Sequence, residues 1–391
     1  MQTWIEEELA TSDFGDERLD KRFMAVMDCL NQKPSASIAA ACGTWGEVQA
    51  AYRFFDNDRV DEHEVLHPHQ AATVDRIAAH DVVLLAQDTT ELDVTRPEKQ
   101  MVGAGPLHDE FHIGFHDHAM LAVTPERIPL GVVGAKIWAR DWDEVGSAEV
   151  LGTWEVEVKK NTPKAHTDRK RNQPRSARTA VLTIRATRVT LKGPYRPGGK
   201  LADLEINAVL VRETAPPSGE EPIEWLLLTS LPINTWKKVC LVIDYYCCRW
   251  QIEIYFRVLK SGCRVEELQL ETAERFKPCL ALYMIVAWRV MYVMMLGREC
   301  PEMSCDRVFS EDEWKSVYTV VCRKPAPKAA PTLEKMIYLI ASLGGHLGRS
   351  CDGPPGPKQM WIGMQRMTDL ARAWRTFGPP ARRVGKRKSC V

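Results

Sequence analysis

The chain has 391 residues, 45% of them hydrophobic and 27% charged, and its 52 basic and 52 acidic side chains give a formal net charge of zero. This composition is typical of a soluble globular protein with one large core or two to three domains, and its balance of charge gives no general indication of nucleic-acid binding. The 12 cysteines are scattered without a common zinc spacing, which excludes a disulfide framework and favours thiols in a reducing cytoplasm. The acidic start has no apolar core, so we expect no secretory signal.

Two helices are predicted near the start of the chain. Residues 12–31 carry apolar side chains at helical spacing, with Asp16 as the N-cap. Thr44 and Glu47 have the spacing of a capping box, which predicts a second helix that runs through Phe54. The basic side chains on these helices that suit DNA contact are Arg18, Arg22 and Arg53. A small DNA-binding head and an ordinary solvated helix face explain them equally well.

Three strands are predicted after residue 80. Residues 82–86 form a continuous apolar run, as expected of a strand buried on both faces, and the run ends just before Asp88. Further strands are expected at 118–123 and 130–137, which suggests the first half of a mixed α/β sheet. A carboxylate at the end of a buried strand is costly unless it is paired or binds metal, which makes Asp88 a candidate metal ligand.

A β-rich block is expected at about 150–232, with strand patterns at 180–190, 205–212 and 225–229. Within it, residues 159–178 hold eight lysines and arginines against one aspartate. Such a basic hairpin tip suits phosphate contact, and a solvated loop is the alternative. We favour DNA contact because other DNA signals accompany it.

Helical patterns resume at about residue 235 and dominate to the end. Residues 279–297 are long and apolar enough to cross a membrane, but Arg289 near their middle favours a buried helix in a large core. A last amphipathic helix is predicted over 359–374, and the basic sequence after residue 378 predicts a disordered tail.

The most specific pattern is a stripe of polar side chains around Glu253. The residues that fall within an arc of about 80° on an ideal helix, along about 20 Å of its axis, are Tyr246, Arg249, Glu253, Arg257 and Lys260. A salt-bridge ladder would also place Arg249, Glu253 and Arg257 at this spacing. A ladder explains neither the phenol nor the excess of cations. A carboxylate that holds a divalent metal ion, beside cations that hold phosphates, explains both.

The spacing of Tyr246, Arg249, Glu253 and Lys260 resembles the signature of the insertion-sequence-four transposases, a family of cut-and-paste DNA transposases that includes the Tn-five enzyme. LLAQDTTELD around Asp88, EWLLLTS, FGDERLDKRF, AAYRFFDN and TLEKMIYLIASLGGHLGR also resemble segments of that family, so the likeness covers nearly the whole chain.

The resemblance implies an α/β fold, with a ribonuclease-H-like mixed sheet and a β-rich insertion at about 150–232. The implied domains are a helical transposon-end DNA-binding domain at 1–75, the catalytic domain at 76–298, a helical dimerisation region at 299–378 and a basic tail at 379–391.

The resemblance also assigns roles to residues. It makes Asp88 and Glu253 catalytic ligands of Mg²⁺ or Mn²⁺, with two ions in a complete site, and lets Trp225 stack on a base flipped out of the transposon end. The remaining residues that it places on DNA, together with the head arginines above, are Tyr246, Arg249, Arg257 and Lys260. The implied partners are double-stranded transposon ends, target DNA and a second copy of the chain, in the bacterial cytoplasm, with no membrane.

One departure from the family matters as much as the match. The family carries a second catalytic aspartate at the end of a fourth strand, and no apolar run followed by such an aspartate occurs between Asp88 and Glu253. The simplest explanation is an internal deletion after about residue 144, in which case the sheet is incomplete. We therefore expect a transposase with impaired catalysis unless another acid, such as Asp143, replaces the missing one. The alternative is a non-catalytic remnant that binds DNA, dimerises and regulates transposition.

Overall fold

The computed structural model describes residues 4–107, 111–140, 181–191, 195–196, 199–200, 202–213, 224–349 and 351–378. The chain divides into two compact units, one made of Met1–Gly146 with Cys248–Val391 and the other of Ser147–Cys247. The basic segment 159–178, Asp143 and the tail at 379–391 lie outside the described residues, so the expectations made for them stay predictions.

The first unit begins with α1 (Trp4–Glu8), α2 (Glu17–Gln32), α3 (Ile38–Cys42), α4 (Trp45–Phe55) and α5 (Glu62–Ile77). The Asp16 side chain accepts the backbone N–H of Arg18, so the first predicted helix starts at Glu17 and not at residue 12. The capping box predicted at Thr44 and Glu47 is confirmed, because each side chain bonds the backbone of the other residue.

The sheet of the first unit contains β1 (Leu84–Asp93), β2 (Gly105–Pro106), β3 (Ile113–Val123) and β4 (Pro129–Trp138). β3 lies in the middle and pairs antiparallel with all three other strands, so the strands predicted at 118–123 and 130–137 are confirmed. Among the described residues, β3 is the one strand that pairs with β1, which is therefore an edge strand there.

Two expectations for β1 were wrong. The strand continues through Asp88 to Asp93, because ten consecutive residues pair with β3, so Asp88 lies in its middle and not at its end. The strand is also not buried on both faces, since Val82 just before it is 43% exposed and Leu85 is 55% exposed. The apolar run alone could not show which side of an edge strand has a neighbour.

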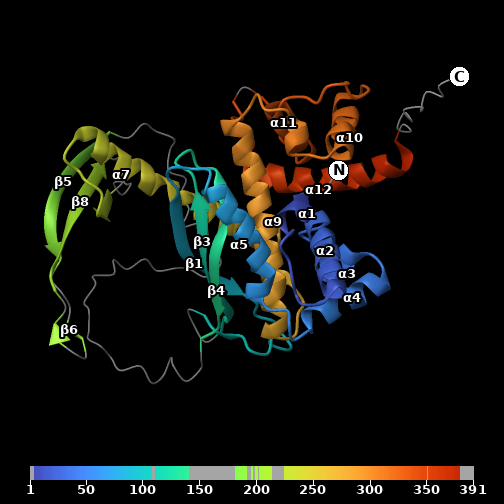
Figure 1. Ribbon diagram of the computed structural model, residues 1–391, viewed down its shortest axis with the longest axis horizontal. Helices are drawn as coiled ribbons and strands as arrows, with labels where there is room; N and C mark the ends of the chain where they lie inside the picture. The colour runs from blue at the N-terminus through green and yellow to red at the C-terminus, as the bar shows by residue number, and fades with distance from the viewer. Residues whose placement is uncertain are drawn as a thin grey trace, which may run out of the picture. The chain divides into compact units, whose positions relative to one another are not determined.

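The C-terminal part of the first unit contains α8 (Trp250–Arg257), α9 (Ala273–Glu299), α10 (Glu311–Cys322), α11 (Leu333–Leu343) and α12 (Pro357–Phe377). Three short helical segments connect them: η2 (Val258–Gly262), η3 (Val265–Glu267) and η4 (Cys305–Arg307). α12 covers the helix predicted at 359–374. α10, α11 and α12 pack on one another, and α12 also reaches α2 (Figure 1).

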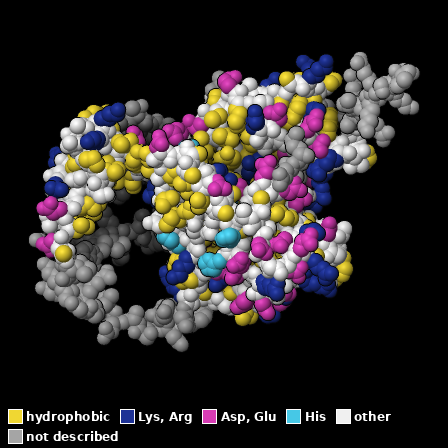
Figure 2. Space-filling model, viewed as in Figure 1, with side chains coloured by type: hydrophobic (Ala, Val, Ile, Leu, Met, Phe, Trp, Pro, Cys, Tyr) yellow, Lys and Arg dark blue, Asp and Glu magenta, His cyan; other side chains and the backbone are white. Residues whose placement is uncertain are grey.

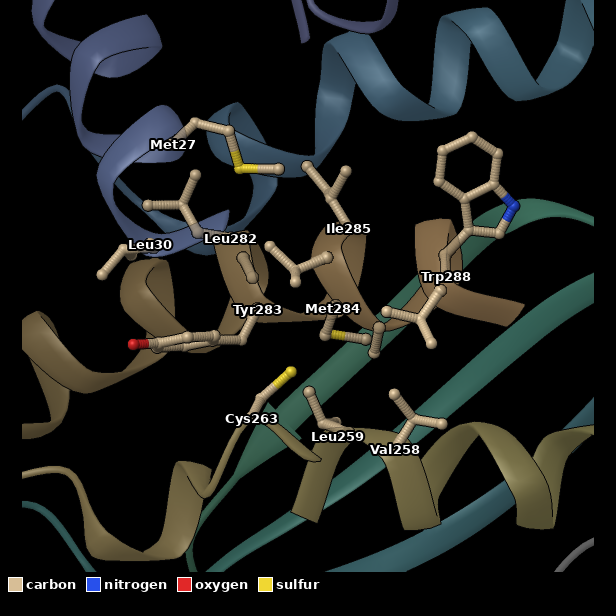
Figure 3. Close-up of a cluster of buried hydrophobic side chains, with 14 of the residues drawn as sticks. Met27, Leu30, Val258, Leu259, Cys263, Leu282, Tyr283, Met284, Ile285 and Trp288 are labelled. Atoms are coloured by element: carbon tan, nitrogen blue, oxygen red, sulfur yellow. The ribbon is translucent and has the colours of Figure 1, made fainter. Parts of the chain in front are cut away.

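α9 is the central helix of this unit. It packs against α2 and α4 on one side and against α5 and β4 on another (Figure 1). Its side chain Leu282 lies beside Met27 of α2, and Met284 faces Leu259 of η2 (Figure 3). Within the described residues it is the one helix long and apolar enough to cross a membrane, and 89% of its most apolar window is buried, so the expectation of a buried core helix is confirmed. The core that fixes η2, next to Lys260, is thus continuous with the N-terminal helices.

The second unit contains an antiparallel sheet of β5 (Leu182–Leu191), β8 (Leu204–Glu213) and β9 (Glu224–Thr229), with β8 in the middle. β6 (Tyr195–Arg196) and β7 (Gly199–Lys200) form a separate two-stranded ladder. α7 (Trp236–Cys248) packs Val239 and Val242 against Val209 and other apolar residues of β8 and β9. The strands predicted at 180–190, 205–212 and 225–229 are confirmed.

Candidate active site

Asp88 and Glu253 meet at one guanidinium group in the first unit. The Arg249 Nη1 atom lies 3.4 Å from Asp88 Oδ2, and Nη2 lies 2.6 Å from Glu253 Oε1. The structure therefore brings together two acids that are far apart in the sequence, on the two sides of a single planar cation. We expected the two carboxylates to share a metal ion, and their role as metal ligands stays a prediction.

The three side chains are positioned by a strand and a helix turn. Asp88 projects from β1, and its Oδ1 atom accepts the backbone N–H of Thr89 at 2.8 Å. Arg249 sits in the turn between α7 and α8, and Glu253 lies one helical turn later, in the first turn of α8. α8 packs on β1 and β3, and its residues Ile252 and Tyr255 are fully buried. The packing of an amphipathic helix on the sheet therefore sets the distance between the two carboxylates.

The cluster is accessible to solvent. The side chains of Asp88, Arg249 and Glu253 are 42%, 38% and 34% exposed. A metal ion or a DNA phosphate can thus reach these groups without opening the core.

The prediction of one continuous helical stripe from Tyr246 to Lys260 was wrong. α7 ends at Cys248, and Val258–Gly262 forms a turn of π-helix, in which the rotation per residue differs from that of an α-helix. Lys260 consequently turns towards the end of β1, where its Nζ donates to the Glu91 carbonyl at 2.8 Å and lies 3.0 Å from Glu266 Oε1. No pattern in the sequence indicated Glu266 as a partner of Lys260.

Arg257, Tyr246 and Trp225 lie in different surroundings. Arg257 is exposed in the last turn of α8. Tyr246 and Trp225 both belong to the second unit, where their rings are 5.3 Å apart at an angle of 51°. Trp225 is half-buried against the core beneath α7. Its proposed role as a base-stacking residue stays a prediction.

The head arginines lie on the helices expected to carry them. Arg18 and Arg53 are exposed on α2 and α4, and Arg22 is half-buried on α2. Acidic and basic side chains are intermingled over these N-terminal helices on the face that Figure 2 shows. Any DNA contact by the head would therefore depend on individual arginines and not on a large field of one sign.

A third acid, which the sequence did not single out, lies on the same face of the sheet as Asp88. Asp88 pairs with Ala119 and Thr90 pairs with Asp117, so Asp88 and Asp117 project from the same face. Asp117 is fully buried, and within the described part of the chain neither of its oxygens has a hydrogen-bond partner. Burial raises the pKa of Asp117 to about 7. The apolar alternation of β3 does not distinguish this position from its neighbours.

The donor set fits one divalent cation better than two. Carboxylate oxygens are the ligands that Mg²⁺ and Mn²⁺ prefer, and Mg²⁺ is often held by one or two carboxylates with water and substrate phosphate. Asp88 and Glu253 supply two such groups. Among the described residues, however, no three acidic, histidine or cysteine side chains gather closely enough to hold a metal ion, so Asp117 does not complete a triad.

Three family models match the chain. A transposase DNA-binding model matches residues 1–60, a transposase DDE domain matches residues 146–288, and a Tn5 transposase dimerisation domain matches residues 285–377. The DDE match contains Trp225 and Glu253 but begins well after Asp88. It implies a ribonuclease-H-like fold and dependence on a divalent metal ion.

Proposed function

This chain belongs to the Tn5-type transposases, DNA-binding proteins that dimerise, and we propose that it binds transposon ends while its cleavage chemistry is impaired. In this proposal residues 1–75 bind the end, 76–298 form the catalytic domain, 299–378 form the dimer contact, and 379–391 are a basic tail. The activity would be cut-and-paste transposition by strand nicking, hairpin formation and strand transfer.

The observation that carries the proposal is the pairing of Asp88 and Glu253 through Arg249. It supports these two residues as the first aspartate and the glutamate of a DDE site. The described residues contain no further acid close enough to complete that site. Two carboxylates hold divalent metal ions less well than three, and the metal ions stabilise the negative charge of a transferring phosphoryl group, so impaired cleavage follows.

The chain's own side chains have separate tasks in this proposal. Asp88 and Glu253 would hold Mg²⁺ or Mn²⁺, which when bound supplies Lewis-acid stabilisation of the phosphoryl oxygens. Arg249 and the exposed Arg257 would hold backbone phosphates beside the scissile bond, because a guanidinium binds phosphate through two parallel hydrogen bonds. Lys260 would fix the end of β1 through Glu91 and Glu266 and add positive charge nearby.

The DNA end would be held at two further places. Arg18, Arg22 and Arg53 would contact the duplex through the head, and Trp225 would stack on a flipped base, with Tyr246 packed against its ring. Aromatic stacking of this kind is worth about 1–3 kcal/mol per base.

A second function is testable because the matched DNA-binding and dimerisation models do not depend on a complete metal site. A chain that binds ends and dimerises without cutting would form inactive dimers with an intact relative. It would then act as a dominant-negative regulator of transposition.

The proposal is tested with DNA that carries the sequences flanking the coding region at both of its ends. The purified chain should retard this DNA in a gel-shift assay, but with Mg²⁺ or Mn²⁺ it should nick it no faster than the Glu253→Gln variant does. Addition of the chain to an intact homologue should lower the homologue's cleavage rate if the chain is a regulator. Robust metal-dependent cleavage that Glu253→Gln abolishes would contradict impairment and direct attention to Asp143.

A further inference from the structure

We infer that Arg249 is a resident counter-cation of the active site, which must leave the space between Asp88 and Glu253 before a divalent metal ion can bind both carboxylates. A DNA phosphate is the group that draws it away. The inference rests on the proposed function, because it concerns the same two carboxylates, and it adds a coupling between DNA binding and metal binding that the family assignment does not contain.

The geometry sets two cations in competition for one place. The Arg249 guanidinium bridges the acids, at 3.4 Å from Asp88 Oδ2 and 2.6 Å from Glu253 Oε1. A metal ion bound to the same two oxygens would occupy the region that the guanidinium fills. Two positive charges at such a separation repel each other, so occupation by one disfavours the other.

The guanidinium is able to leave because the cluster is open to solvent. All three side chains are more than one third exposed, and ion pairs of this exposure are weak and exchange readily with water. Arg249 is also held at its backbone by a helical turn that is independent of its side chain, since its carbonyl accepts the N–H of Ile252. Reorientation of the side chain therefore need not disturb α8 or Glu253.

A phosphate is the partner that fits the released side chain. A guanidinium donates two parallel hydrogen bonds to phosphate, and a nucleic acid backbone presents phosphates at regular spacing. When Arg249 moves to a phosphate, Asp88 and Glu253 lose their counter-charge and become better metal ligands. By linkage, bound DNA then raises the affinity for metal and bound metal raises the affinity for DNA by the same factor.

The neighbouring cations do not share this position. Lys260 donates a hydrogen bond to the Glu91 carbonyl and forms an ion pair with Glu266, near the end of β1. Arg257 is exposed about two helical turns after Arg249. The exposed Arg307 of η4, which has no task at the site, supplies a control for loss of one positive charge. The competition is thus a property of one residue, which a single substitution can remove.

The test is a titration of the full-length chain with Mn²⁺ in the absence of DNA, with free Mn²⁺ measured by electron paramagnetic resonance. Arg249→Gln should bind Mn²⁺ about tenfold more tightly than the wild-type chain, because the single positive charge that lies between the two carboxylates and repels the metal ion is lost. Arg249→Lys keeps a positive charge but loses the forked guanidinium that spans both acids, so its Mn²⁺ affinity should lie between those of the wild-type chain and Arg249→Gln. Arg307→Gln should match the wild type, and the double variant Asp88→Asn, Glu253→Gln should lose the site.

Each outcome separates the inference from the proposed function. Binding by Arg249→Gln that is equal to or weaker than wild-type binding, while the double variant loses it, would overturn the counter-cation role and leave the metal site standing. Equal Mn²⁺ binding by all variants, the double variant included, would remove Asp88 and Glu253 as ligands and the proposed function with them. Circular dichroism confirms that each variant is folded. If Arg249→Gln fails to fold, Arg249→Lys carries the comparison alone.

Discussion

Two clusters of the first unit use the same chemistry, a guanidinium between acceptors, and differ in burial. Arg249 bridges Asp88 and Glu253 at the surface, whereas Arg76 binds both oxygens of Glu8, at 2.8 Å each, inside the protein. In the inner cluster Glu8 is 7% exposed and His69 is fully buried. The comparison separates a cluster that can release a partner from one that cannot.

The inner cluster is fully bonded by groups from several elements. The His69 Nδ1 atom lies 2.6 Å from Glu8 Oε1, and Nε2 accepts the backbone N–H of Val132, so the proton of the neutral ring is on Nδ1. Arg76 also donates to the Leu130 carbonyl and lies 4.5 Å from the ring centre of Trp288. Burial by itself would raise the pKa of Glu8, but the hydrogen bonds from His69 and Arg76 outweigh it and lower that pKa. The cluster ties α1 and α5 to β4 and α9.

The difference shows that burial and complete hydrogen bonding, and not residue type, decide whether such a cluster stabilises the fold or stays available to a ligand. A buried pair whose groups are all bonded contributes to structure, and removal of one member leaves an uncompensated charge. A half-exposed pair contributes little stability but stays available to a ligand. The following predictions test this distinction, in order of expected effect.

Glu8→Gln should produce the largest loss of stability. It removes the buried carboxylate that the partly buried Arg76 and the buried His69 both bond, so the free energy of unfolding should fall by about 3–5 kcal/mol. Urea unfolding followed by circular dichroism measures the change. The control is Glu17→Gln, which breaks the exposed pair with Lys21 and should leave the unfolding curve unchanged. A loss as small as that of the control would show that the inner cluster is not structural.

Asp117 extends the comparison to an acid that is buried but has no described bonding partner. Its folded-state pKa is raised from 3.8 to about 7, so the folded chain keeps the proton to higher pH than the unfolded chain does. This contribution to stability is fully present below about pH 4 and is lost as the pH rises through about 7, by on the order of 4 kcal/mol. Asp117→Asn should remove this pH dependence in urea unfolding measured from pH 4.5 to 7.5. A constant difference between the two proteins over that range would contradict it.

At the outer cluster, Asp88→Asn and Glu253→Gln should each change the free energy of unfolding by less than about 1 kcal/mol, because their charges are partly solvated. The same substitutions should weaken Mn²⁺ binding. Calorimetric titration with Mn²⁺ and urea unfolding of the same samples give both quantities. A loss of stability close to that of Glu8→Gln would place this cluster with the structural one.

The smallest effect on stability is expected at Arg53, which is exposed on α4 and contacts the Gln49 side chain of the same helix at 3.4 Å. Arg53→Ala should leave unfolding unchanged but lower the slope of log affinity against log salt by about one, since one phosphate contact is lost. Fluorescence anisotropy with a labelled DNA duplex at several salt concentrations measures this slope. The matched control is Arg307→Ala, an exposed arginine outside the head. An equal change in this slope for both variants would show that Arg53 makes no specific contact with DNA.

The sequence by itself determined the local elements and the family. Asp16 and the Thr44–Glu47 capping box set helix starts through contacts within a few residues, and the spacing from Tyr246 to Lys260 matches the transposase signature as a linear pattern. Local hydrogen bonds and periodicity depend only on residues that are close together in the sequence, which is why these features could be predicted.

Only the tertiary structure decided which faces and side chains meet. The sequence could not show that β1 is an edge strand in the described part of the chain, or that a π-helical turn directs Lys260 to Glu266. It also carried no sign that Asp117 is buried without a bonded partner among the described residues. Nor could it show that Arg249 stands between Asp88 and Glu253, because that contact needs α8 to pack on β1 across 161 residues of chain. Burial and long-range contact are set by packing, and the periodicity of a single segment does not contain them.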